Sequence, residues 1–334
     1  MSIPDRLRTL ARIALVLVVA VIAAATGWFL FVDYPASLTD LLGMLVAVMV
    51  VAGGLQLGSR LSSRVFPSYT VAEVAVEGPI TRDSGSSGIP RGPMTPGTDD
   101  IVEQIDAADA DRAVEALLLK LNTPGGEVVP SEDIRRAAEE FDGPTIAYTQ
   151  DLCASGGMWI ASGCDEFWAR EGSIVGSVGV IFAQFRVDEL LDRLGVDYEG
   201  ITSGEYKDAL SPFRPMEDEH REYAQALSDA WYEQFVERVA QGTGMSEDAV
   251  RETEARIYLG MEAQELGMVD SLGDREVIEE QLEDEIDGPV RVEEFSPKGG
   301  LAERLRSGAA DIAFALGAGF ASRFGGEADG LRMR

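Results

Sequence analysis

The sequence predicts an α/β fold in which helices pack outside stacked sheets, preceded by N-terminal transmembrane helices. Two observations carry this prediction. The chain opens with two long apolar runs, and from Tyr69 onward strand-like segments alternate with amphipathic segments of helical length. Such alternation is typical of α/β proteins. We therefore expect a membrane anchor at residues 1–66, a folded domain at 67–296 and a Gly/Ala-rich C-terminal segment of open role at 297–334.

The anchor is expected to contain two membrane spans, at residues 13–32 and 41–57. The first run contains no charged residue and has the roughly 20 residues that cross a bilayer. The second run is shorter, so a single span followed by an interfacial segment is the alternative. Arginines precede the first run and follow the second, and the loop between them has none. By the positive-inside rule, a hairpin places the large domain on the cytoplasmic side of the cell membrane, whereas a single span places it outside.

The expected strands of the domain are short and rich in β-branched and apolar residues. They lie at residues 69–77, 114–121, 145–149, 166–169, 175–182, 198–202 and 290–295. The expected helices lie at residues 98–108, 131–141, 158–162, 187–194, 217–241, 261–266 and 275–285, and Ser246 caps one more. In the long helix, Tyr223, Leu227, Trp231 and Phe235 recur at helical spacing, which is typical of a core or a subunit interface.

Charge and composition exclude several classes of function. The chain has 58 acidic and 28 basic residues, a net charge of -30, and no basic patch of the kind that nucleic acid requires. An acidic, lysine-poor surface is typical of adaptation to high salt, so we expect a halophilic source. Two cysteines and one histidine predict neither a metal site nor a cofactor. The histidine, His220, lies among acidic residues and is interpreted as part of a solvated helical face, which disfavours a Ser-His mechanism.

Ser155 is the candidate nucleophile. It stands between tiny residues, directly before an apolar segment that begins at Met158. The glycines after it, Gly156 and Gly157, let a carbonyl group approach and leave backbone N–H groups free to stabilise negative charge. Taken alone, the stretch is more typical of a small-residue turn where a strand meets a helix. Its neighbour Cys153 is expected to pack behind it.

A serine needs a base, and Lys207 is the candidate. Only three of the 28 basic residues are lysines, and lysine can lose its proton where arginine cannot. Burial would lower its pKa toward the working pH. The alternative, in which Lys207 simply pairs with Asp208 or Glu205, is equally compatible with the composition.

Two further glycine-flanked positions complete the candidate site. Ser177, between Gly176 and Val178-Gly179, offers a hydroxyl that can hold a neutral amine, although a turn at a strand edge explains it as well. Gly125-Gly126 follows an expected strand, and its backbone N–H groups, with that of Gly156, are candidate donors to an oxyanion.

The motifs that contain these candidate residues resemble, in their order and spacing, those of the signal peptide peptidase A family. Members of this family are membrane-anchored serine peptidases with the ClpP/crotonase fold. The matching blocks are residues 122–126, 154–157, 176–180 and 203–208, followed by 263–270. The resemblance covers roughly residues 69–295. This chain departs from the family in having Met158-Trp159 where aromatic pairs are usual, which bears on the substrate pocket.

The resemblance implies roles for the candidate residues. Ser155 would be the nucleophile and Lys207 the general base, with Ser177 orienting the lysine. Gly126 and Gly156 would donate to the oxyanion. Family members assemble into rings or domes, in which the lysine can come from a neighbouring subunit, so a homo-oligomer is expected.

The sequence therefore predicts a membrane-bound serine endopeptidase that acts through a Ser/Lys dyad and an acyl-enzyme. The expected substrates are signal peptides or other membrane-derived peptides. Two alternatives remain, a crotonase-like acyl-CoA enzyme and a non-catalytic membrane scaffold that recruits partners through its helical half.

Overall fold

The computed structural model describes most of the domain and little of the anchor. It covers residues 69–83, 96–286 and 288–296, with short pieces at 13–14, 16–22, 25 and 53–54. Among the described residues, none of the helices has both the length and the apolar character of a membrane span. Most of the two expected spans, 13–32 and 41–57, and all of the segment 297–334 lie outside the described residues.

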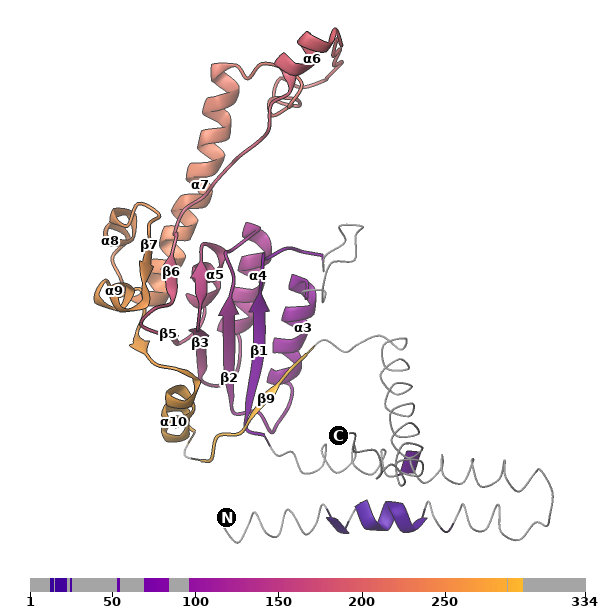
Figure 1. Ribbon diagram of the computed structural model, residues 1–334, viewed down its shortest axis with the longest axis vertical. Coiled ribbons are helices and arrows are strands. Elements are labelled where there is room, and N and C mark those ends of the chain that lie inside the picture. Colours follow the sequence, from indigo (N-terminus) through magenta and orange to yellow (C-terminus); the bar gives the residue numbers. More distant parts are fainter. Residues whose placement is uncertain are drawn as a thin grey trace, which may run out of the picture.

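A six-stranded parallel sheet forms the centre of the domain (Figure 1). Its strands, in spatial order, are β8 (Ser271–Leu272), β5 (Glu166–Ala169), β3 (Thr145–Thr149), β2 (Ala116–Asn122), β1 (Val71–Glu77) and β9 (Val292–Glu294). Leu119 of β2 pairs with Val74 of β1 on one side and with Ala147 of β3 on the other. The central strands are almost continuously buried, as expected when both faces of a parallel sheet are covered.

A second, smaller sheet adjoins the first. It consists of β4 (Leu152–Ala154), β6 (Ile174–Gly176) and β7 (Ile257–Leu259), with β6 in the middle. An isolated bridge between Thr123 and Cys153 joins the end of β2 to β4. The predicted α/β class, with more than one sheet and helices outside, is confirmed.

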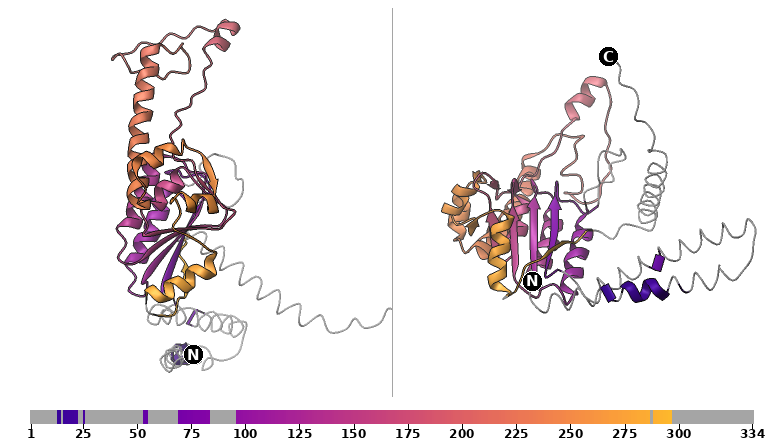
Figure 2. Two further views of the ribbon diagram at one scale, coloured as in Figure 1. Left: turned by 90° about the vertical axis from the view of Figure 1, so that its left-hand side faces the viewer. Right: turned by 60° about the horizontal axis from the view of Figure 1, so that its bottom comes forward.

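The described part of the domain contains eight helices, most of which pack around the sheets. They are α3 (Thr98–Asp109), α4 (Val128–Glu139), α5 (Gly156–Ala161), α6 (Asp188–Leu194), α7 (Asp218–Thr243), α8 (Glu247–Glu252), α9 (Gly260–Glu265) and α10 (Arg275–Glu285). Leu117 and Leu119 of β2 belong to the large core under α3, α4 and α5. Leu118 belongs to a separate core with Ile278 and Leu282 of α10. The two faces of the sheet are thus covered by different helices (Figure 2).

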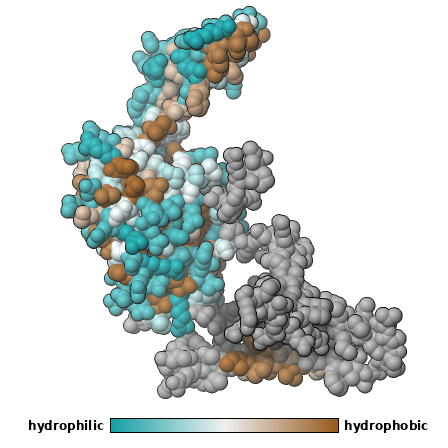
Figure 3. All heavy atoms as spheres, viewed as in Figure 1, coloured by the Kyte–Doolittle hydropathy of each residue, from teal (hydrophilic) through white to brown (hydrophobic). Residues whose placement is uncertain are grey.

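Residues 181–230, here called the arm, project from this body. The arm comprises the irregular segment after β6, helix α6 and the first half of α7, and it extends well beyond the sheets (Figure 1). Large apolar side chains gather on it (Figure 3). Among the most exposed are Ile181, Phe185, Leu194 and Ile201. The second half of α7 packs instead against α5 through Phe235, which is buried.

Three expected elements differ from the structure. The strand expected at 175–182 ends at Gly176, because Gly176 (φ 114°) and Ser177 (φ 57°) adopt left-handed backbone that a strand cannot continue. The strand expected at 198–202 is absent from the described chain, where this segment is irregular and exposed. Helix α4 begins at Val128 rather than at Ser131.

The interpretation of His220 as a solvated residue is wrong. Its exposed fraction is only 5%. The ring of Tyr206 covers it edge-on at a centroid distance of 5.9 Å, and Nη2 of Arg214 lies 3.3 Å from its Nδ1. Helical spacing did predict the helix, but the covering residues come from another segment of the chain.

Candidate active site

Ser155 has a strained backbone at the junction of β4 and α5. Its φ of 51° and ψ of -118° lie in a region that residues with a side chain rarely adopt. Such geometry costs on the order of 1–3 kcal/mol and persists only where surrounding contacts impose it. The Ser155 N–H donates to the carbonyl of Gly176 at 2.9 Å, and its carbonyl accepts from the Trp159 N–H at 3.2 Å. The residue is therefore held from both sides while remaining partly exposed.

Two backbone N–H groups lie free beside Ser155. Within the described part of the chain, the amides of Gly126 and Gly156 donate no hydrogen bond. They are close to each other, because a side-chain carbon built on Gly156 would lie 3.2 Å from the Gly126 nitrogen. Gly126 is held by a bridge to Ile80, which approaches so closely that a side chain at Gly126 would collide with the Ile80 carbonyl. Two free donors next to a serine can stabilise an oxyanion.

A groove of about 700 Å³ brings the candidate residues together. Ser155, Ser177, Gly126 and Gly156 all line it. Its remaining walls are mostly apolar and include Pro124, Val128, Val129, Pro130, Trp159, Val180, Ile181, Trp231 and Phe235. The sequence indicated a core or interface role for Trp231 and Phe235, but their place on this groove depends on how α7 crosses α5.

Lys207 does not line the groove. It is exposed on the arm, directly after Tyr206, whose ring contacts His220 and Tyr223 near the beginning of α7. Trp231, farther along the same helix, lines the groove. A helix rises 1.5 Å per residue, so about 17 Å of α7 separate His220 from Trp231. Within a single chain, Ser155 and Lys207 are therefore far apart.

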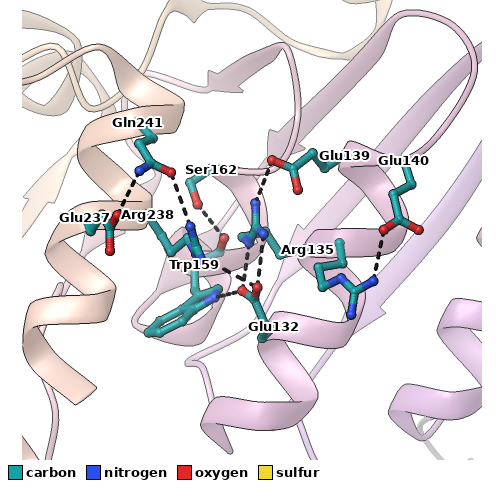
Figure 4. A network of polar contacts seen from close by, with 10 residues as sticks. Glu132, Arg135, Glu139, Glu140, Trp159, Ser162, Glu237, Arg238 and Gln241 are labelled. Atoms are coloured by element: carbon teal, nitrogen blue, oxygen red, sulfur yellow. Dashed lines mark hydrogen bonds and ion pairs between the residues drawn. The ribbon is translucent and has the colours of Figure 1, made fainter. Parts of the chain in front are cut away.

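A polar network holds the aromatic floor of the groove (Figure 4). Nε1 of Trp159 donates to Oε2 of Glu132 at 2.6 Å, and Arg135 binds both oxygens of the same carboxylate at 2.7 and 3.0 Å. Burial opposes the charge of Glu132, but the hydrogen bonds from Arg135 and Trp159 outweigh it and lower the pKa of this carboxylate. No local pattern in the sequence indicated this network, since Glu132 and Trp159 belong to different helices.

The cysteines are poor candidates for catalysis. Cys153 is fully buried, and burial raises the pKa of its thiol far above the usual range. Burial likewise raises the pKa of Cys164 to about 12. Cys153, two residues before Ser155, belongs to the large buried core. No group of three or more potential metal ligands occurs among the residues that the structure describes.

One family model and several curated proteins match part of the chain. Residues 138–287 match the model described as Peptidase family S49, a range that includes Ser155, Ser177 and Lys207. The putative protease slr0021 of Synechocystis sp. is 39% identical over 169 residues, which are 50% of this chain and 61% of that protein. The putative protease MJ0651 of Methanocaldococcus jannaschii is 36% identical over 185 residues, which are 54% of this chain and 60% of that protein.

A third relative and two solved structures complete the comparison. The putative signal peptide peptidase SppA of Enterococcus faecium is 36% identical over 51% of this chain and 51% of that protein. The chain thus spans about half to three fifths of the length of these curated relatives. A mutant of the 1510-N membrane-bound stomatin-specific protease has a TM-score of 0.43 at 16% identity, over 69% of this chain and 99% of that one. A mutant of ClpP1 from Listeria monocytogenes has a TM-score of 0.41 at 13% identity, over 61% and 92%.

Proposed function

From the premise that the chain carries a Peptidase family S49 domain, we propose that it is a serine endopeptidase with Ser155 as nucleophile. The observation that carries this proposal is the strained Ser155 beside the two free amides of Gly126 and Gly156, all on one groove. Strain of this kind clusters at functional sites. An apolar groove suits the apolar segments of signal peptides or other membrane-derived peptides, and the expected anchor would hold the enzyme at the membrane where they accumulate.

The base that we assign is Lys207, supplied by a neighbouring copy of the chain. Within one chain its segment lies on the arm, away from the groove, and the arm exposes apolar residues such as Phe185 and Ile201 that another copy can cover. The lysine would then enter the neighbour's groove, where Ser177 can hold its amine. Burial in that interface would favour the neutral amine that a base requires.

The reaction follows from these positions. The neutral Lys207 amine takes the proton of the Ser155 hydroxyl as its oxygen attacks the peptide carbonyl. The N–H groups of Gly126 and Gly156 donate to the oxyanion of the tetrahedral intermediate. Collapse expels the amine, which receives the proton from Lys207, and leaves an acyl-enzyme. Water, deprotonated by the same lysine, then hydrolyses the ester.

A labelling experiment with matched variants tests the proposal. A fluorophosphonate should label the wild type and fail to label Ser155→Ala, and peptide hydrolysis should be lost in both Ser155→Ala and Lys207→Ala. Lys120→Ala is the control, because Lys120 pairs with Glu77 at 2.9 Å on the main sheet and should be dispensable for hydrolysis. Full hydrolysis by Lys207→Ala would exclude the dyad.

The same experiment separates the two other functions that the sequence leaves open. A crotonase-like enzyme would bind acyl-CoA and need no nucleophilic serine. A scaffold would retain its cellular role in Ser155→Ala.

A further inference from the structure

Trp159 lines the same groove as Ser155. The two residues are four apart across the start of α5, and a backbone hydrogen bond of 3.2 Å joins them. Trp159 thus lies within the first turn of the helix that begins directly after Ser155. The indole lines the groove although only 3% of the residue is exposed, so it forms the floor rather than the rim.

The indole of Trp159 is fixed from two directions. At its edge, Nε1 donates to Glu132, which Arg135 holds through two hydrogen bonds (Figure 4). Arg135 is itself 6% exposed at its side chain, and Nε of Arg238 on α7 approaches the same carboxylate at 3.9 Å. The ring of Phe235 packs against the indole at a centroid distance of 4.9 Å, with the two ring planes tilted by 40°. A ring held in this way sets a definite depth for the groove.

We infer that Trp159 is the size-limiting floor of the subsite that receives the side chain on the acyl side of the scissile bond, and that Glu132 is its positioning residue. This inference rests on the proposed peptidase function and deepens it. The walls around the floor, including Val128, Val180 and Phe235, are apolar, so the subsite takes an apolar side chain. A group too large for the space above the indole is rejected.

Substitution of Trp159 should change which substrate side chain the enzyme prefers on the acyl side of the scissile bond. In Trp159→Ala the groove deepens by the volume of an indole, and in Trp159→Phe by part of it. Each methylene that fits or fails to fit such a pocket changes the preference about 10- to 200-fold. We therefore expect the ratio of kcat/KM for a peptide with Phe on the acyl side over one with Ala to rise at least about tenfold in Trp159→Ala.

Trp168 provides a matched control. Its Nε1 donates to Glu166 at 2.6 Å, the same distance as between Trp159 and Glu132, but it lies in the separate core beneath α10 and not on the groove. Trp168→Phe should leave the Phe-to-Ala ratio unchanged, even if the protein melts at a lower temperature. A folded Trp159→Ala with an unchanged ratio would overturn the inference.

The positioning role of Glu132 has its own test. Glu132→Gln retains an oxygen that accepts from the indole and should preserve the preference for peptide size, whereas Glu132→Ala frees the ring and should relax it. The emission maximum of tryptophan fluorescence should shift to longer wavelength in Glu132→Ala only. If Glu132→Gln, Glu132→Ala and the wild type all show the same preference for peptide size, Glu132 has no positioning role.

The failure of this inference is distinguishable from failure of the proposed function. The affinities of the same two peptides are measured for Ser155→Ala and for Ser155→Ala combined with Trp159→Ala. If wild type neither reacts with fluorophosphonate nor cleaves peptides, the proposed function fails. The role of Trp159 is still tested in that case. If Trp159 limits the size of the bound side chain, adding Trp159→Ala must change the ratio of the affinities for the two peptides.

Discussion

Gly125 lies directly against Ser155. A side-chain carbon built on Gly125 would lie 2.7 Å from the Cβ of Ser155 and 2.6 Å from the amide nitrogen of Gly156. Gly125 also has a φ of 94°, which favours glycine. The loop after β2 and the turn after β4 are thus in contact through atoms that leave no room for a methyl group.

Gly125→Ala should therefore abolish the function of the site while leaving the fold in place. The added methyl must displace either Ser155 or the Gly156 amide. Loss of one oxyanion donor alone costs about a hundredfold or more in rate. We expect the rate of fluorophosphonate labelling of Ser155 to fall at least that far.

Gly244→Ala is a control, because it introduces a side chain at a positive φ without a collision. Gly244 also has a positive φ, of 72°, at the end of α7, but nothing lies within 4 Å of an added carbon. Gly244→Ala should lower the free energy of unfolding by about 1 kcal/mol and leave the rate of fluorophosphonate labelling unchanged. Equal labelling of Gly125→Ala and Gly244→Ala would show that the contact at Ser155 has no functional effect.

The two cysteines should be inert in the folded protein. At pH 8 an ordinary thiol, with a pKa of about 8.5, is about one quarter thiolate. Burial raises the pKa of Cys164 to about 12 and that of Cys153 further, so the reactive form is scarce and inaccessible. Iodoacetamide at pH 8 should modify neither residue until urea is added, as mass spectrometry would show. Rapid alkylation of Cys153 in the folded state, with loss of peptide hydrolysis, would instead indicate a cysteine nucleophile.

The residues that line the groove were identified in the sequence from their glycine-flanked motifs and the family resemblance, whereas the structure shows that each follows a strand. Ser155 comes after β4 and Ser177 after β6, two neighbours in the small sheet, and Gly126 follows β2 by four residues. The carboxyl ends of neighbouring parallel strands meet at one edge of a sheet. The sequence predicted neither β4 nor the end of β6 before Ser177, so local signals identified these residues but not the strand ends that bring them together.

Other features depend on contacts between distant segments and have no local signal. The acidic neighbours of His220 suggested solvent, but Tyr206 covers it from another segment. The hydrogen bond between Trp159 and Glu132 joins α5 to α4, 27 residues away. The distance of Lys207 from the groove follows from the direction of the arm, which no periodicity in the sequence encodes.

Mixing two inactive variants should restore hydrolysis. Copies with Ser155→Ala retain Lys207, and copies with Lys207→Ala retain Ser155. In a randomly mixed ring, about one site in four pairs an intact serine with an intact neighbouring lysine. We expect hydrolysis near that fraction of the wild-type rate, measured with a fluorogenic peptide after the variants are dissociated and reassembled together.

Two further mixtures serve as controls for this experiment. Neither variant should recover when it is mixed with a chain that carries both substitutions. A mixture that stays inactive, although both variants are present in the same assembly, would place the base in the same chain as the nucleophile.

The crossing of α7 over α5 requires Gly242. A side-chain carbon built there would lie 2.3 Å from the carbonyl oxygen of Ser162, the residue that ends α5. In most helices a change from glycine to alanine stabilises by about 1 kcal/mol. Here the collision should reverse the sign, and overpacking typically destabilises by about 1–3 kcal/mol. Gly242→Ala should therefore lower Tm by several degrees.

Gly172→Ala is the control for Gly242→Ala, because Gly172 is exposed and nothing lies within 4 Å of an added carbon. Its stability should stay within about 0.5 kcal/mol of wild type. Since α7 also carries Trp231 and Phe235 into the groove, Gly242→Ala should weaken peptide affinity in a Ser155→Ala background as well. A Gly242→Ala protein that melts at or above the wild-type temperature would mean that α7 can move away from α5 at no cost, and the groove would then lack the fixed wall described above.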